Sequence, residues 1–152
     1  MGSTQIPHFH QINNYYCGPA IIQMVLASRG IRDTQRAIAA KARTTRKSGT
    51  STKGLVAAVR SYGLTVKSRE NMNIGDIKRA LAKGSIVVVC YTEMQLNWGH
   101  YAIIIGFRGD SIRLIDPAER LGTIVDIDVK EFVRRWRDPL FTKSNRWAAF
   151  VS

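Results

Sequence analysis

Two apolar segments joined by the dipeptide Gly109-Asp110 constrain the fold of this chain more than any other feature. The segments span 100–108 and 111–116, and both are rich in isoleucine. Glycine followed by aspartate is a typical two-residue turn between antiparallel strands, because glycine readily adopts the positive φ that such a turn needs. We therefore expect a β-hairpin, with the start of its first strand close to the end of its second.

The rest of the chain predicts a helical first half and a strand-rich second half. Apolar spacing and end signals predict helices over 18–29, 34–40, 52–62, 74–83 and 129–136. Asp33 and Asp128 are the expected N-caps of the second and the last of these helices. Further strands are predicted over 64–69, 86–91, 123–127 and 146–151. Helices followed by a mostly antiparallel sheet indicate the α+β class. A length of 152 residues without repeats or linkers fits one domain over 1–152.

Composition excludes several other classes of protein. Hydrophobic residues make up 45% of the chain, and the longest apolar run, 86–91, has the length of a buried strand rather than of a membrane span. The first residues show no signal peptide. Two cysteines are too few for a disulfide framework or a zinc pattern, and His8 and His10 lack further ligands nearby. We therefore expect no transmembrane segment and no metal, and a flexible leader or an edge strand around His8.

Cys17 lies where the first predicted helix begins, with Gln11 six residues before it. Unpaired N–H groups at a helix N-terminus favour negative charge, and thiolate is the reactive form of cysteine. A glutamine amide can donate to an oxyanion beside such a sulfur. The segment thus indicates one half of a cysteine-nucleophile site. Cys90 is interpreted as a buried thiol, and we disfavour a Cys17–Cys90 disulfide because it would block that chemistry.

His100 and Asp116 supply the other half of the predicted site. Taken alone, His100 has the ordinary explanation of a packed histidine, and Asp116 that of a turn residue before proline. The predicted hairpin brings these two strand ends together. That spacing suits a carboxylate that orients an imidazole ring and fixes its tautomer.

These segments resemble the C39 family of papain-like cysteine peptidases, which includes the bacteriocin-processing proteases and many stand-alone C39-like domains. The resemblance covers about 6–136 and rests on three motifs in order, with a similar Gly-Thr-Ser turn between the first two. The motifs are Gln11 with Cys17-Gly18-Pro19-Ala20, then Gly99-His100-Tyr101, then Ile115-Asp116-Pro117. It implies a papain-like fold with N-terminal helices packed on the sheet.

The resemblance also implies a role for each residue. Cys17 would be the nucleophile and His100 the general base and acid, while Asp116 would orient His100. The Gln11 side chain would share the oxyanion hole with the backbone N–H of Cys17. No metal or organic cofactor is implied. All four positions hold the residue type that the family uses, which argues against an inactive copy.

The implied substrate is a peptide or protein, with cleavage after a double-glycine leader as the default. The candidate substrate-binding residues are Tyr16, Gly18, Trp98 and Gly99. Trp98, or Tyr15 with Tyr16, would wall a narrow cleft. The transmembrane region and ATPase of exporter-linked relatives are not in this chain. The same nucleophile would also serve a papain-like deamidase or transamidase.

A net charge of +12 leaves a third alternative open, a delivered antibacterial toxin. Its basic surface would bind an anionic target such as a nucleic acid, although no RNA-binding or helix-turn-helix motif accompanies the charge. An acidic protein partner, such as an immunity protein, would fit the same surface. The compartment stays open between the bacterial cytoplasm and a secreted or delivered location. The basic residues concentrate at Lys41, Arg43, Arg46, Lys47 and Lys53, and at Arg134, Arg135, Arg137, Lys143 and Arg146.

Overall fold

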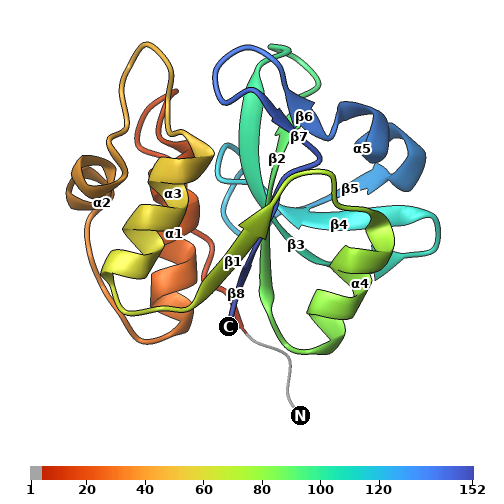
Figure 1. Cartoon of the computed structure of the whole chain (residues 1–152), viewed down its shortest axis with the longest axis horizontal. Helices are drawn as coiled ribbons and strands as arrows, with labels where there is room; N and C mark the ends of the chain where they lie inside the picture. The colour runs from red at the N-terminus through yellow and green to blue at the C-terminus, as the bar shows by residue number, and fades with distance from the viewer. Residues whose placement is uncertain (1–4) are drawn as a thin grey trace.

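Figure 1 shows the computed structural model of the chain, in which residues 5–152 are described. A layer of three helices packs on one face of a six-stranded sheet, and two further helices pack on the other face. The first layer consists of α1 (Cys17–Ser28), α2 (Gln35–Ala42) and α3 (Thr52–Ser61), and the second of α4 (Ile74–Ala82) and α5 (Val129–Arg135). The α+β class is confirmed.

The sheet is antiparallel throughout, with strand order β1-β8-β2-β3-β4-β5. Its strands are β1 (Val66–Arg69), β2 (Ile86–Thr92), β3 (Gly99–Arg108), β4 (Ser111–Ile115), β5 (Ile124–Asp128) and β8 (Ala148–Val151). A second, two-stranded sheet of β6 (Arg137–Asp138) and β7 (Ser144–Asn145) was not expected. Strands of two residues carry no alternating pattern, so the sequence gives no periodic signal for them.

One of the two expected capping residues is confirmed, since Asp128 caps α5 by accepting from the backbone of Glu131. The Ser51 side chain caps α3, although no cap had been predicted there. The expected Asp33 cap of α2 is wrong, because Thr34 accepts from the Ala37 N–H instead, at 3.1 Å. The Asp33 carboxylate accepts instead from the Tyr62 hydroxyl at 2.5 Å and from the Thr34 N–H at 2.8 Å, and not from an N–H within α2.

The expected hairpin of β3 and β4 forms around Gly109-Asp110, but it contains a β-bulge. Pairing shifts by one residue between Ile104 and Gly106, so Ile105 has no partner on β4. Side chains of a strand alternate between faces, and one extra residue reverses that alternation. Ile104 and Phe107 accordingly pack in the same apolar cluster although they are an odd number of residues apart.

The bulge determines where the end of β4 points. With the shifted register, Ile103 pairs with Ile115, so the next residue, Asp116, comes opposite Ala102. Ala102 and His100 are two residues apart and lie on the same face. A regular register from the turn would have set Asp116 opposite Ile103 and on the other face. The extra residue therefore puts Asp116 and His100 on one side of the sheet.

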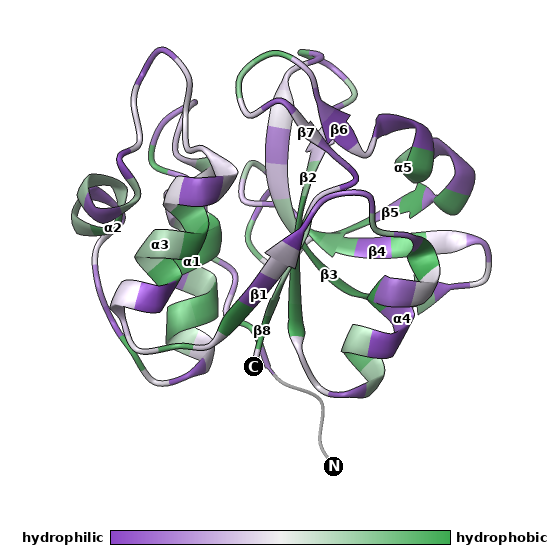
Figure 2. Ribbon diagram, in the orientation of Figure 1, coloured by the Kyte–Doolittle hydropathy of each residue, from purple (hydrophilic) through white to green (hydrophobic). Residues whose placement is uncertain are grey.

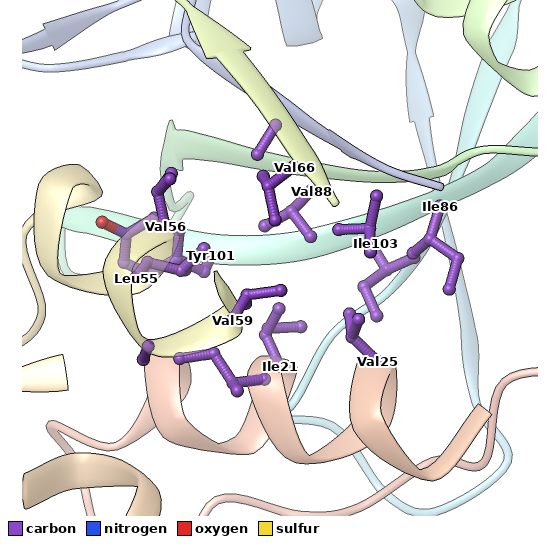
Figure 3. Close-up of a cluster of buried hydrophobic side chains, with 14 of the residues drawn as sticks. Ile21, Val25, Leu55, Val56, Val59, Val66, Ile86, Val88, Tyr101 and Ile103 are labelled. Carbon is purple, nitrogen blue, oxygen red and sulfur yellow. The ribbon is translucent and has the colours of Figure 1, made fainter. Parts of the chain in front are cut away.

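Two apolar clusters fill the space on either side of the sheet. Hydrophobic residues run along α1, β3 and β8 in Figure 2. Figure 3 shows the first cluster, in which Ile21 and Val25 of α1 and Val59 of α3 meet Val88 and Ile103 of the sheet. The second cluster lies under α4 and α5 and includes Ile77, Phe132 and Trp136. Burial of this kind contributes about 25 cal/mol per Å² of apolar surface removed from water.

Within residues 5–152, no helix has both the length and the apolar character needed to span a membrane.

Candidate active site

Cys17 is the first residue of α1 and is half-buried. The backbone at this helix start packs tightly against the loop before α3, since a Cβ atom added to Gly18 would collide with the side chain of Thr50. Thr50 is in turn held by a hydrogen bond of 2.7 Å between its hydroxyl and that of Thr44. Glycine at position 18 thus lets the loop 44–50 lie directly beside the thiol.

His100 and Asp116 meet at the end of the sheet that faces Cys17. Nε2 of His100 lies 2.5 Å from Oδ1 of Asp116, and both residues are buried. Asp116 Oδ1 also accepts from the Ala118 N–H at 2.8 Å, and Oδ2 accepts from the Tyr91 hydroxyl at 3.3 Å. The Tyr91 ring packs edge-on against His100. The carboxylate is therefore fixed from three directions, and it fixes one ring nitrogen of His100.

The positive charge of His100 and the negative charge of Asp116 stabilise each other. Burial lowers the pKa of His100, but the hydrogen bonds and charges of Asp116 and Cys17 outweigh it, so the pKa lies above its ordinary value. Burial likewise raises the pKa of Asp116, and the contacts with His100, Ala118 and Tyr91 bring it below its ordinary value. The geometry favours an imidazolium beside a carboxylate, with the other ring nitrogen left for the thiol.

Gln11 lies in a segment that crosses from the helical layer to the end of β4. Its backbone N–H donates to the Pro117 carbonyl at 2.9 Å, and its Nε2 donates to the Asn13 carbonyl at 2.8 Å. Oε1 of Gln11 is buried and has no partner among the described residues. Because Nε2 carries two N–H groups and donates only one of them to Asn13, the other remains for another acceptor.

His8 belongs to the same crossing segment. Our expectation of a flexible leader or an edge strand around His8 is therefore wrong. One ring nitrogen lies 3.0 Å from the Asp116 carbonyl, and the other accepts from the Gly122 N–H at 2.9 Å. Both ring nitrogens are therefore used within the fold. Across residues 5–152, no three His, Cys, Asp or Glu side chains lie close enough to hold a metal ion.

A cavity of about 190 Å³ opens beside Cys17 and His100. Trp98 and Gly99, two of the predicted substrate-binding residues, line it together with Tyr15 and loop 46–50. The other two, Tyr16 and Gly18, are buried and are not among the residues that line it. A second, larger groove continues past His100 and shares Asn14 and Trp98 with the first.

Asp138 and Tyr91 are site residues that sequence reasoning missed. Asp138 is 1% exposed, and its carboxylate accepts from the backbone N–H groups of 140–142. A Cβ atom on Gly99 would collide with this carboxylate, so the end of β6 lies directly against the residue before His100. The signal in the sequence was Asp138-Pro139, a turn-starting pair. Tyr91 sat inside an apolar run with no such signal.

Cys17 and Cys90 are both free thiols. Cys90 lies fully buried in β2 and lines the first cavity. Burial, followed by the charges of Asp138 and Cys17, raises the pKa of the Cys90 thiol to about 12. Cys90 is thus kept as an unreactive thiol beside a thiol at a helix start.

A thiol, an imidazole and a carboxylate in this order are able to carry out acyl transfer. The model of the Peptidase_C39 like family matches residues 3–142 of the chain. An uncharacterized protein of Methanothermobacter thermautotrophicus is 33% identical over 108 residues, which are 71% of this chain and 69% of that protein.

Two solved structures share the fold. The peptidase domain of Streptococcus ComA, a bifunctional ABC transporter involved in a quorum sensing pathway, superposes with a TM-score of 0.77 at 18% identity, over 97% of this chain and 98% of that domain. A double glycine motif protease from an AMS/PCAT transporter, solved in complex with the leader peptide, gives a TM-score of 0.70 at 23% identity, over 99% and 93% of the two chains.

Proposed function

Because this chain belongs to the Peptidase_C39 like family and has its papain-like cysteine peptidase fold, we propose that it is an active cysteine peptidase with Cys17, His100 and Asp116 as its catalytic triad. The observation that carries this proposal is the 2.5 Å contact of His100 Nε2 with Asp116. It leaves Nδ1 of the ring for the thiol at the start of α1. A histidine packed only for stability would not need a free nitrogen beside a cysteine.

The proposed reaction has two acyl-transfer steps. Cys17 Sγ, having given its proton to His100, attacks the carbonyl carbon of the substrate amide. The tetrahedral intermediate collapses when His100 protonates the leaving nitrogen, so the C–N bond breaks and a free amine departs. Water then attacks the thioester while His100 accepts its proton. The C–S bond breaks, and the carboxylic acid and the Cys17 thiol are released.

The negative oxygen of the intermediates needs donors that are already in place. The backbone N–H of Cys17 lies at the start of α1, where the first N–H groups have no partner within the helix. Nε2 of Gln11 has a second N–H beyond the one bonded to Asn13. We assign these two groups to the oxyanion hole.

The proposed substrate is a peptide with small residues before the cleaved bond. The double glycine motif protease that shares the fold was solved with a leader peptide, which supports this class. The cavity beside Cys17 is small, and Gly99, Tyr15 and Trp98 form part of its wall. Glycine residues would fit such a cavity because they have no side chain that needs space.

The test is mass spectrometry of peptides that contain a double glycine, incubated with wild type and with Cys17→Ala. Cleavage after the glycines by wild type only is the expected result. A mass increase of about one dalton on an intact peptide would instead indicate deamidation and overturn the peptidase assignment. Iodoacetamide should label Cys17 rapidly and not Cys90, and His100→Ala should abolish the rapid labelling of Cys17.

A further inference from the structure

The second groove beside the triad carries a charge opposite to that of the whole protein. It has a volume of about 680 Å³ and continues past His100, away from Cys17. Six of the 11 acidic residues of the chain line it, and no lysine or arginine does, although the chain has 23 of them. These acidic residues are Glu93, Asp116, Glu119, Asp126, Asp128 and Glu131. We call this feature the acidic groove.

Half of these carboxylates are already paired within the fold. Asp116 pairs with His100, Asp126 with Arg113, and Glu131 with two arginines of α5. Among the described residues, Glu93, Glu119 and Asp128 form no ion pair. The acidic groove therefore retains negative charge that a ligand can neutralise.

The acidic groove also has apolar walls. Met94 and Leu96, in the loop between β2 and β3, are 53% and 62% exposed and line it, as does Val125 of β5. Gln11 lines it too, and its buried Oε1 is an acceptor without a partner among the described residues. A ligand that fits would combine cationic groups with apolar side chains and N–H donors, as a basic peptide segment does.

The chemistry of the triad gives the direction in which a peptide would lie. The acyl part of the substrate is bonded to Cys17, which lines the first cavity and not the acidic groove. The leaving nitrogen must lie within reach of His100, which lines both. The segment that follows the cleaved bond is thus directed past His100 into the acidic groove.

We propose that the acidic groove binds the segment on the leaving-group side of the cleaved bond and selects segments that carry lysine or arginine together with apolar residues. This inference rests on the proposed function, because the direction of the peptide follows from the triad. Glu93 and Glu119 are the specificity-determining residues. The groove also keeps acidic segments out, since like charges repel there.

The first test compares two capped peptides that share a Gly-Gly segment and continue with alternating Lys and Leu or with alternating Glu and Leu. Wild type should show a kcat/KM about tenfold higher for the Lys peptide, and the preference should shrink as salt is added. Glu93→Gln/Glu119→Gln should reduce the preference to about threefold or less. Glutamine at position 93 keeps an acceptor for the Leu96 N–H, which Glu93 binds.

A matched control separates a local effect from a change of net charge. Glu70→Gln/Asp110→Asn raises the net charge by the same amount outside the groove and should keep the wild-type preference. Equal kcat/KM for the two peptides in wild type would overturn the proposal. So would an equal loss of preference in the groove variant and in the control variant.

A binding measurement keeps this inference separate from the proposed function. Fluorescence anisotropy of the same two peptides, labelled and mixed with Cys17→Ala, should show tighter binding of the Lys peptide, and the two groove substitutions should reduce that difference to about threefold or less. If neither peptide is cleaved by wild type but this preference is seen, the groove assignment stands and the peptidase assignment fails. Equal binding of both peptides overturns the groove assignment even if both are cleaved.

Discussion

The two sides of the proposed triad are positioned by different physical means. Cys17 is placed by local structure, because it begins α1 and its neighbour Gly18 packs on one loop. His100 and Asp116 are placed by strand register, by a bulge, and by buried hydrogen bonds between segments that are distant in sequence. A nucleophile that begins a helix is thus visible in a short motif. Its acid–base partners exist only once the sheet has formed.

The difference has an energetic side as well. Cys17 is half-buried, and its loss removes few contacts. The pair of His100 and Asp116 is buried, and removal of one member leaves the other charge without compensation. Breaking such a pair costs about 3–5 kcal/mol in other proteins. The acid–base side should therefore couple activity to stability, whereas the nucleophile side should not.

The largest effect should come from Asp116→Asn. We expect kcat to fall about a hundredfold or more, because His100 loses the charge that orients it and stabilises the imidazolium. The free energy of unfolding should fall as well, whereas Cys17→Ala should abolish activity and leave unfolding nearly unchanged. Peptide assays and urea denaturation of both variants test the contrast. Equal stability of the two variants would contradict it.

The pH dependence of the same pair should follow from the directions of the two pKa values. The pKa of His100 is raised in the folded state, so its stabilisation is complete below about pH 6.5 and is lost as the pH rises through the folded-state value. The pKa of Asp116 is lowered, so its stabilisation is present above about pH 4 and is lost as the pH falls through the folded-state value. Urea denaturation across this range, with Asp116→Asn as reference, should show the difference greatest between these limits.

The next largest effect should come from alanine at the two glycines beside the triad. A Cβ on Gly99 meets the Asp138 carboxylate, which three backbone N–H groups hold in place, so we expect a loss of about 2–3 kcal/mol. A Cβ on Gly18 meets the Thr50 side chain, which a single hydroxyl contact holds, so the loss should be nearer 1 kcal/mol. Denaturant titrations of both variants test this order. A larger loss of unfolding free energy in Gly18→Ala than in Gly99→Ala would contradict it.

Tyr91→Phe should have a smaller and more specific effect. It removes the hydroxyl that Asp116 accepts and keeps the ring that packs on His100, so the stability should fall by about 1 kcal/mol. The alkaline limb of kcat against pH should move to lower pH, since Asp116 is held less firmly against His100. Tyr62→Phe is a matched control, because Tyr62 also donates to a carboxylate, that of Asp33, far from the triad. It should leave the pH profile unchanged.

The smallest effect belongs to the helical layer. Thr34→Ala removes the side chain that caps α2 and should cost about 1 kcal/mol of stability with no change in kcat or in its pH profile. Thr34→Ser should restore most of that stability, because it keeps the accepting hydroxyl. A shift in the alkaline limb with Thr34→Ala would show that the two sides are coupled more closely than their contacts indicate.

Features that depend on neighbours in the sequence could be predicted, and features that depend on distant contacts could not. The start of α1, the Asp128 cap and the hairpin turn could be predicted because a few adjacent residues determine each. The hairpin turn also predicted that the strand ends carrying His100 and Asp116 would lie close together, but their shared face depends on the bulge, which was not predicted. The catalytic roles of the two residues stay predictions. The Thr34 cap was missed because Tyr62, which follows α3 and is distant in the sequence, binds Asp33.

The site residues that the sequence did not reveal were missed for the same reason, because each acts through contacts between distant segments. Tyr91 contacts Asp116 only through the pairing of β2 with β3, where Tyr91 lies opposite His100. Asp138 contacts Gly99 only because the end of β6 packs against the start of β3. The bulge near Gly106 was equally hidden, since a glycine within a strand pattern admits several explanations.

Because of the bulge, whether His100 and Asp116 share a face of the sheet depends on whether their separation in sequence is odd or even. Across a regular two-residue turn, residues that share a face differ by an odd number, yet His100 and Asp116 differ by 16. The one extra residue in β3 places two residues with an even separation on the same face. If the bulge is kept, removal of one other residue from either strand would leave both side chains in the sequence but place them on opposite faces, whereas removal of Ile105 itself would leave them on one face. Hairpins that keep such a bulge should therefore tolerate changes of length in steps of two, and an even interval in a related chain should itself signal a bulge.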